Sequence, residues 1–350
     1  MPFVPKLSRR VAVKSLAAAS AGLLWGMRPV TAAKRDSKWD EAITKGLNWV
    51  AKTQNSAGYW TASGYTAAMT ALAGTALIAS GSTTTQGPYS KAIRKAVDYL
   101  VDVKFNRNTG LLGDSQDNRY TYGHGFSMLF LSQVLGEEED EERRLQLIEV
   151  LSKSVEFSGR AQTPSGGWGY ISAKDGNNFD EGSTTITQVQ GLRGCRNGGI
   201  VVPGDIIDKA KEYIYSCMNP DGGISYSSRN RGSSRPAITA AALATLYNAG
   251  DYEGKQVPQM LEYCKKNLQN LSEGPNSFGH WHYTYLYYSQ VMYRQGGKEW
   301  EPFRDKLCNR IVGELGGKDN WEGNVGAIYV TACNLIMLQL DKAYLPIFQR

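Results

Sequence analysis

Cysteine is scarce in this chain of 350 residues, and the few cysteines form no recognisable pattern. Their number is odd, and no two of them are separated by only two residues. The sequence therefore has neither the disulfide framework of a small secreted domain nor the paired thiols of a zinc ribbon. Most of the cysteines lie inside apolar helical patterns, which predicts buried free thiols. The five positions are Cys195, Cys217, Cys264, Cys308 and Cys333.

Motifs for several common chemistries are also missing. The chain has no phosphate-binding loop and no serine nucleophile elbow, and Gly123-His124-Gly125 does not follow a strand as a nucleotide loop would. The apolar run from Ser15 to Met27 is shorter than the roughly 20 residues of a transmembrane helix. We therefore expect no cofactor and no transmembrane segment in the mature chain.

Acidic residues are absent from the first 33 positions, whereas Lys6, Arg9, Arg10, Lys14 and Arg28 are basic. These five charges account for most of the formal net charge of +6, so the remainder is nearly neutral and nucleic-acid binding is not expected. The segment Ser8-Arg9-Arg10, the apolar run and the small residues 31–33 resemble a twin-arginine export signal. We expect residues 1–33 to direct export of the folded protein to the periplasm or cell envelope, and residues 34–350 to form a single domain.

Loops rich in glycine and aromatic residues recur along the chain. A helical pattern with a charged face precedes each loop, as in residues 90–105, and a helix rich in small residues follows it, as in residues 235–250. The loops are NSAGYW (55–60), NTGLLGD (108–114), PSGGWGY (164–170), NPDGGISY (219–226), NSFGHWHY (276–283) and GGKDNWEG (316–323).

Each unit is thus predicted to be an outer helix, a glycine-aromatic loop and an inner helix. Six units make an all-α chain of twelve helices. Charged helices suit an outer ring that faces water, and small residues suit a crowded inner ring. The inner helices then begin on the same side of the ring, so their partial positive charges converge there. We expect the ligand site at this rim.

The six helical pairs resemble the (α/α)6 toroid of squalene/terpene cyclases and protein prenyltransferase β-subunits. The loops SGGWGY and DGGISY carry the resemblance, which covers about residues 38–345. It implies a central cavity for an isoprenoid or another apolar ligand. The cyclase motif Asp-x-Asp-Asp is absent, and Asp180-Glu181 is the nearest acidic pair. These two carboxyl groups are candidate proton donors if burial raises their pKa; the alternative is an acidic helix start capped by Ser183 or Thr184.

The zinc site of the prenyltransferases is incomplete in this sequence. Arg235-Pro236-Ala237 occupies the place of their Asp-x-Cys pair, although His282 resembles their histidine ligand and His280 precedes it. Since one ligand of three does not hold zinc, we expect no metal and assign both histidines to the ligand-binding rim as hydrogen-bonding groups.

A basic cluster lies in the loop with which the resembled prenyltransferases grip diphosphate. Arg229, Arg231 and Arg235 stand at or before an inner-helix start, which suits an anionic group; alternatively they are solvated loop residues. Trp168 and Tyr283 are the aromatic residues that we assign to an apolar ligand.

Three functions remain open at this stage. The first is a terpene cyclase- or prenyltransferase-like toroid that binds an apolar ligand, with or without catalysis. The second is a non-catalytic toroid that binds a protein or peptide, and the third is a carbohydrate-active enzyme with paired carboxylates. We expect a monomer. The acidic residues at the rim that are compatible with a carbohydrate-active enzyme are Asp114, Asp180, Glu181, Asp221, Asp319 and Glu322.

Overall fold

The structure is a computed structural model that describes residues 36–176, 179–271 and 281–348. The predicted export signal and His280 lie outside these residues. The chain divides into two units, residues 1–37 and 38–350, and the second contains nearly all of the described helices. Within the described residues the regular structure is helical, with two isolated β-bridges and no strand.

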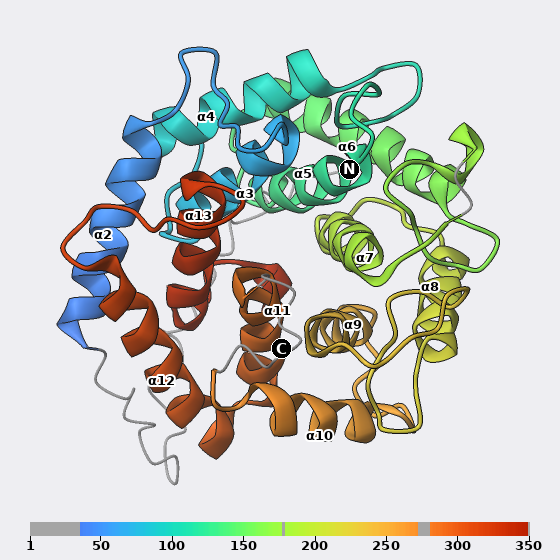
Figure 1. The fold of residues 1–350 in the computed structure, drawn as a ribbon. Coiled ribbons are helices and arrows are strands. Elements are labelled where there is room, and N and C mark those ends of the chain that lie inside the picture. Colours follow the sequence, from blue (N-terminus) through green and yellow to red (C-terminus); the bar gives the residue numbers. More distant parts are fainter. Residues whose placement is uncertain (1–35, 177–178, 272–280, 349–350) are drawn as a thin grey trace, which may run out of the picture. The chain divides into compact units, whose positions relative to one another are not determined.

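The second unit consists of outer and inner helices that alternate along the chain (Figure 1). The outer helices are α2 (Ser37–Lys52), α4 (Ser90–Asp98), α6 (Glu141–Ala161), α8 (Gly204–Ser216), α10 (Val257–Leu268) and α12 (Gly297–Leu315). The inner helices are α3 (Thr66–Ile78), α5 (Tyr120–Leu135), α7 (Gly182–Asn197), α9 (Pro236–Asn248), α11 (Trp281–Gln295) and α13 (Ala327–Leu338). A π-helical turn, η1 (Tyr99–Lys104), extends α4, and short 3-10 helices are η2 (Ala173–Asp175), η3 (Leu340–Lys342) and η4 (Pro346–Phe348).

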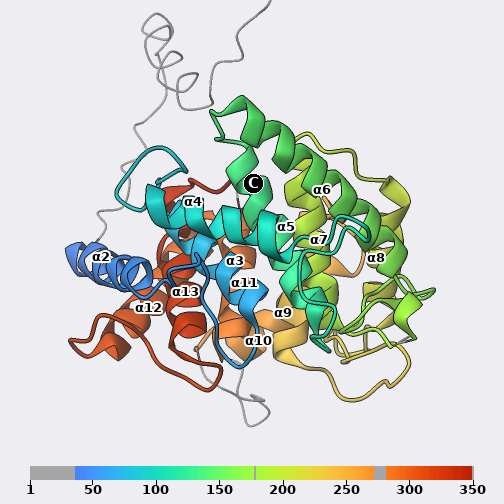
Figure 2. The ribbon, with the colours of Figure 1, turned by 90° about the horizontal axis from the view of Figure 1, so that it is seen from above.

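The inner helices of this unit form a closed ring. Each contacts the next along the chain, from α3 through α5, α7, α9 and α11 to α13, and α13 packs back against α3. Figures 1 and 2 show the outer helices wrapped around this ring. The predicted (α/α)6 toroid is therefore confirmed, and an open solenoid is excluded.

Burial differs between the rings as the residue types require. On α4, Ala92, Ile93, Ala96 and Val97 form one buried face. Nearly every residue of α3 is buried, and a Cβ atom at Gly74 would lie only 2.5 Å from the ring of Phe130 on α5. The absence of a side chain at Gly74 thus leaves room for the Phe130 ring, and the two inner helices pack closely.

The loops are fastened to the outer helices by a repeated hydrogen bond. The indole of Trp168 donates to the Ser158 carbonyl of α6 at 2.8 Å, and the backbone N–H of Trp168 donates to the Thr185 hydroxyl of α7 at 3.2 Å. Trp60, Trp281 and Trp321 likewise donate to the carbonyl ten residues earlier. In the first, third and sixth repeats, Trp60, Trp168 and Trp321 thus fix the loop between the two rings and position the start of the following inner helix.

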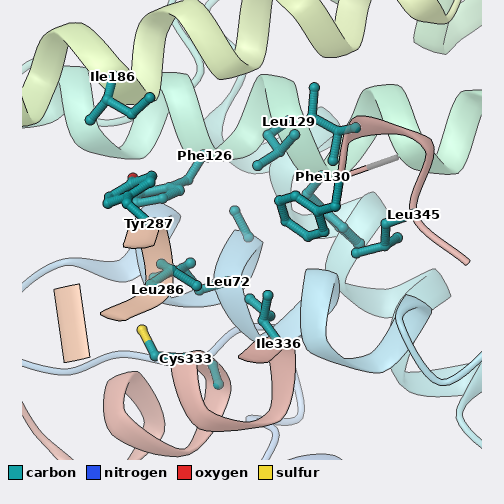
Figure 3. Close-up of a cluster of buried hydrophobic side chains, with 14 of the residues drawn as sticks. Leu72, Phe126, Leu129, Phe130, Ile186, Leu286, Tyr287, Cys333, Ile336 and Leu345 are labelled. Carbon is teal, nitrogen blue, oxygen red and sulfur yellow. The ribbon is translucent and has the colours of Figure 1, made fainter. Parts of the chain in front are cut away.

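The end of the ring where the inner helices finish is occupied by apolar side chains and the chain's last described residues. Phe130, Ile336 and Leu345 belong to the buried cluster in Figure 3. Ile347 N–H donates to Gln133 Oε1 at 3.3 Å, and the Arg294 guanidinium donates to the Ile347 carbonyl. A cavity in the ring is therefore placed at the other end, where the inner helices begin.

The candidate ligand cavity

A cavity of about 380 Å³ lies at the end where the inner helices begin. All six helical pairs contribute to its wall, as expected for a site on the axis of the ring. The lining residues are Tyr65, Ala68, Met69, Leu72, Arg119, Tyr122, Phe126, Tyr170, Ser183, Tyr226, Arg235, Ala237, Ile238, Tyr283, Val325 and Tyr329. The structure thus places a cavity at the rim that the converging helix starts predict.

The wall is mainly aromatic and aliphatic. Six of the lining residues are tyrosines, and neighbouring rings contact one another: the centroids of Tyr122 and Tyr170 are 5.9 Å apart, and those of Tyr65 and Tyr122 are 6.5 Å apart. Tyr283, which the sequence analysis assigns to an apolar ligand, is among the lining residues. Its buried hydroxyl has no hydrogen-bond partner among the described residues, and burial raises its pKa well above the usual value. The wall therefore combines apolar surface with a few polar groups that can orient a ligand.

Two arginines bring positive charge to the mouth. The guanidinium of Arg119 lies 4.8 Å from the ring centre of Tyr170, and that of Arg235 lies 4.7 Å from the ring centre of Tyr226. The hydroxyls of Tyr170 and Tyr226 are hydrogen bonded to each other. Among the described residues that line the cavity, none is acidic.

Glu181 lies behind the wall and caps α7. Its carboxylate accepts hydrogen bonds from the backbone N–H groups of Ser183 at 2.8 Å and Thr184 at 2.6 Å, and from the Ser183 hydroxyl. Ser183 and Tyr122 both line the cavity, and their hydroxyls are hydrogen bonded to each other. Burial raises the pKa of Glu181, although the hydrogen bonds from Ser183 and Thr184 oppose this. The predicted cap is present, but Glu181 supplies it rather than Ser183 or Thr184.

Asp180 does not line the cavity, unlike the ligand-facing proton donor that the sequence suggests. It is fully buried, and its Oδ2 atom accepts a hydrogen bond from the Thr163 hydroxyl at 2.6 Å. A Cβ atom at Gly167 would lie 3.0 Å from Asp180 Cβ and 2.9 Å from the ring of Tyr213 on the outer helix α8. Asp180 therefore packs on the side of the outer ring, and the structure does not support a role in protonating a ligand.

The three predicted arginines do not converge. Arg235 lines the cavity, whereas Arg229 is exposed and is absent from its wall. The guanidinium of Arg231 donates to the carbonyl of Ser216 at the end of α8. The prediction that all three face the mouth is wrong, because the loop directs Arg231 to an outer helix. Arg119, which the sequence analysis missed, directly precedes α5 as Arg235 directly precedes α9. Alignment of the repeats was the signal that could have found it.

Trp168 and His282 also lie outside the wall of the cavity. Trp168 is fully buried by its contacts with α6 and α7, so its assignment to ligand binding is wrong. The half-buried His282 makes an edge contact with Trp281, with 5.0 Å between the ring centres, and does not line the cavity. Burial lowers its pKa, and its Nε2 atom has no hydrogen-bond partner among the described residues. No three histidine, cysteine or acidic side chains within the described ranges are arranged to hold a metal ion.

The rim acids are engaged in separate contacts. Asp114 pairs with Lys104 at 3.5 Å, Asp221 accepts from the Ser234 hydroxyl at 2.6 Å, and Glu322 pairs with Lys318 at 3.2 Å. Asp114 and Asp117 line a smaller neighbouring cavity of about 240 Å³.

The five cysteines are buried and free, as predicted from their positions in apolar helices. Burial raises the pKa of Cys195 to about 12, which keeps this thiol protonated. None of the described helices combines the length and apolarity required to cross a membrane.

Comparison with known proteins supports the fold. No protein-family model matches the chain, and no curated protein is significantly similar in sequence. The apo structure of type II terpene cyclase MstE from Scytonema is similar, with a TM-score of 0.60, 14% identity, and coverage of 90% of this chain and 100% of the cyclase. A variant of that cyclase in complex with geranylgeranyl dihydroxybenzoate has a TM-score of 0.56 and 15% identity, and covers 89% of this chain and 98% of its own.

A carbohydrate enzyme shares the same architecture. An inactive variant of an α-1,6-mannanase from Salegentibacter, in complex with α-1,6-mannotriose, has a TM-score of 0.60 and 10% identity, and covers 86% of this chain and 98% of its own. At such identities the similarity establishes the fold and not the activity. Together with the closed ring, it identifies this chain as an α/α toroid of the fold found in type II terpene cyclases.

Proposed function

We propose that the protein binds an apolar, isoprenoid-like small molecule in the tyrosine-lined cavity. The observation that carries this proposal is the aromatic and aliphatic wall around about 380 Å³ on the axis of the ring. This volume is within the range of small-molecule sites. A solved structure of the same fold is a cyclase bound to geranylgeranyl dihydroxybenzoate, which carries an isoprenoid chain.

The wall is held in position before a ligand arrives. The hydroxyl of Tyr122 is hydrogen bonded to that of Ser183, and the hydroxyl of Tyr170 to that of Tyr226. The Arg119 guanidinium donates a hydrogen bond to the Tyr65 hydroxyl at 3.2 Å. Side chains that are already ordered lose less entropy when a ligand binds. The ordered wall therefore favours binding of an apolar ligand.

Binding without proton-initiated catalysis fits the wall better than cyclisation. Protonation of an alkene requires an un-ionised acid in contact with the ligand. The described wall has no acidic residue, and Glu181 reaches it only through Ser183 and Tyr122. Catalysis by Glu181 therefore requires these two side chains to move aside.

The two other candidate functions have less support. A toroid that only binds proteins needs no internal cavity, and a glycosidase needs two carboxyl groups that face its substrate. The described wall contains a cavity and no carboxyl group. The likeness to the mannanase extends to the fold, so it does not change this preference.

Export by the twin-arginine route stays part of the proposal. It rests on Ser8-Arg9-Arg10 and the segment that follows, outside the described residues. Since a receptor reads the arginine pair, replacing Arg9 and Arg10 together by lysine should keep the protein in the cytoplasm. Cell fractionation measures this, and unchanged export would contradict the localisation.

The ligand proposal is tested by calorimetric titration with farnesol. Ala237 lines the cavity, so Ala237→Trp should fill it and weaken binding at least tenfold. Ala57→Trp is the matched control, because Ala57 is exposed in a loop away from the wall. We expect one farnesol per wild-type chain and equal affinity for the control. Equal binding by the Ala237→Trp variant, or no binding by wild type, would contradict the proposal.

A further inference from the structure

We propose that Ser183 is a nucleophile that cleaves carboxylic esters with an apolar acyl chain, and that Glu181 is its general base. This inference rests on the proposed function, because the acyl chain would fill the same tyrosine-lined cavity. It goes beyond binding, since it assigns a reaction and a substrate class to the wall. Ser183 is the only serine, threonine or cysteine among the described residues that line the cavity.

The register of the repeat directs Ser183 to the cavity. Ser183 lies two residues before Thr185, the α7 residue that accepts the N–H of the glycine-aromatic loop. Two residues before the corresponding threonines of α3 and α9 stand Ala68 and Ala237, and both line the cavity. Ser183 thus occupies a position that faces the ligand in several repeats. Alanine at this position is compatible with the fold, which makes Ser183→Ala a suitable variant.

The Ser183 hydroxyl lies within reach of a base. It donates to the two carboxylate oxygens of Glu181, at 2.6 and 2.7 Å. These distances suit a general base, which must lie within about 2.6–3.2 Å of the group that it deprotonates. Glu181 is fully buried, and burial raises its pKa, which makes its carboxylate a stronger base. Unlike direct protonation of a ligand by Glu181, this role requires neither Ser183 nor Tyr122 to move aside.

Phenol groups beside Ser183 can stabilise the oxyanion that forms in such a reaction. The Tyr122 hydroxyl is hydrogen bonded to that of Ser183, and burial raises its pKa well above the usual value, so it keeps its proton. The ring of Tyr122 contacts that of Tyr170, whose hydroxyl is hydrogen bonded to that of Tyr226. The two hydroxyls of this pair share one proton, so the other proton remains to donate to a ligand. Donors fixed in advance are effective at stabilising an oxyanion.

The reaction balances in two steps, with water as the second reactant. Ser183 Oγ attacks the carbonyl carbon of the ester while its proton passes to Glu181, and the carbonyl oxygen becomes an oxyanion. When the oxyanion collapses, the bond to the alcohol breaks and the alcohol oxygen takes the proton from Glu181. Water then attacks the acyl group on Ser183, with Glu181 again as the base. This second step releases the apolar acid and restores the serine.

Labelling with dodecyl fluorophosphonate tests the nucleophile, because an activated serine displaces the fluoride and retains the phosphonyl group. The probe is added to wild type and to the Ser183→Ala, Glu181→Gln and Ser234→Ala variants, and peptide mass mapping locates the label. Ser234→Ala is the matched control. The Ser234 hydroxyl also donates to a carboxylate, that of Asp221 at 2.6 Å, but Ser234 does not line the cavity. Retained melting temperatures show that the variants are folded.

We expect one label per wild-type chain, on Ser183, and the same labelling rate in Ser234→Ala. Ser183→Ala should take up no label, and Glu181→Gln should react about a hundredfold more slowly, since general bases contribute at least this much. Hydrolysis of para-nitrophenyl octanoate should follow the same order among the variants. Saturating farnesol should block the labelling of wild type, because it fills the cavity that the dodecyl chain enters.

The outcomes separate this inference from the proposed function. If farnesol binds but Ser183 takes up no label, or if Ser234 is labelled as fast as Ser183, the nucleophile is wrong while the apolar cavity stands. Equal labelling rates in wild type and Glu181→Gln would overturn the assignment of the base. Ser183→Ala and the mapped position decide the matter if Glu181→Gln does not fold. If farnesol neither binds nor blocks labelling, the proposed function fails.

Discussion

At the scale of single residues, one position of the repeat shows how a substitution is accommodated. The loop donates a backbone N–H to a threonine hydroxyl of the inner helix at Thr70, Thr185, Thr239 and Thr331. In the second repeat His124 replaces the threonine, and its Nδ1 atom accepts from Leu112 N–H at 3.0 Å. Nε2 therefore carries the proton and donates towards the Ser154 carbonyl and Ser158 Oγ, each at 3.1 Å. His124 is a buried neutral residue of the framework.

We predict that His124→Thr makes the protein less sensitive to acid. Burial lowers the pKa of His124 to about 3, below its ordinary value of 6.5, so the unfolded chain binds a proton that the folded chain rejects. The stability from the neutral imidazole is present above pH 6.5 and is lost as pH falls towards 3. A threonine at this position does not titrate, so the acid-dependent loss of stability disappears. The substitution lowers the free energy of unfolding at neutral pH by about 1–3 kcal/mol, because the packing against Phe157 is reduced.

Denaturant unfolding between pH 3.5 and 7.5 measures this effect. The free energy of unfolding of the variant should fall less steeply with acid than that of wild type. Thr70→Val is the control: it removes an equivalent acceptor without a titrating group, and should lower stability equally at every pH. If the free energy of unfolding depends on pH in the same way for wild type and His124→Thr, His124 is not the buried neutral histidine proposed here.

At the scale of elements, the loop glycines determine how adjacent units dock. Gly58, Gly110, Gly166 and Gly222 have φ angles between +81° and +97°, and each lies against a backbone carbonyl of the next outer helix. Gly166, for example, contacts the Lys209 carbonyl of α8. Only glycine combines this φ with so close an approach. The regular spacing of the units follows from this contact.

We predict that Gly166→Ala destabilises the protein by about 3 kcal/mol or more, since the new Cβ atom would overlap the Lys209 carbonyl. Gly199→Ala is the matched control: Gly199 has φ +90°, but a Cβ atom there meets nothing within 4 Å. The control substitution should lower the free energy of unfolding by about 1–2 kcal/mol, from backbone strain alone. Thermal or denaturant unfolding compares the two, and equal losses would show that docking does not depend on the close approach.

The order of elements was predictable from sequence, whereas the direction of individual side chains was not. Alternation of charged and small-residue helices predicted both rings and the rim. Asp180 and Glu181 are neighbours, yet Glu181 caps α7 and Asp180 packs towards α8. Glu181 has an extended backbone with φ −151° and ψ 160°, and successive side chains of extended chain point in opposite directions. Similarly, the path of a loop decides that Arg235 reaches the cavity and Arg231 does not.

At the scale of the whole described unit, one end of the helical ring is filled by side chains and the other end contains the cavity. The inner helices finish near Arg294, whose guanidinium donates to Asn248 on α9 and to Ile347 near the end of the described chain. Burial lowers the pKa of Arg294 to about 10, so the side chain stays charged at neutral pH. A cation suits this end because the carbonyl ends of the inner helices carry partial negative charge. The opposite end has the tyrosine wall, Arg119 and Arg235.

Mass spectrometry of the protein purified from its own host tests most directly the claim that the cavity holds a small molecule. Intact wild-type protein should carry one apolar small molecule per chain, which is released on denaturation. The Ala57→Trp control should carry the same molecule, and Ala237→Trp, in which the cavity is filled, should carry none. A wild-type chain without any bound molecule, or an Ala237→Trp variant that retains the same molecule in the same amount, would contradict the account.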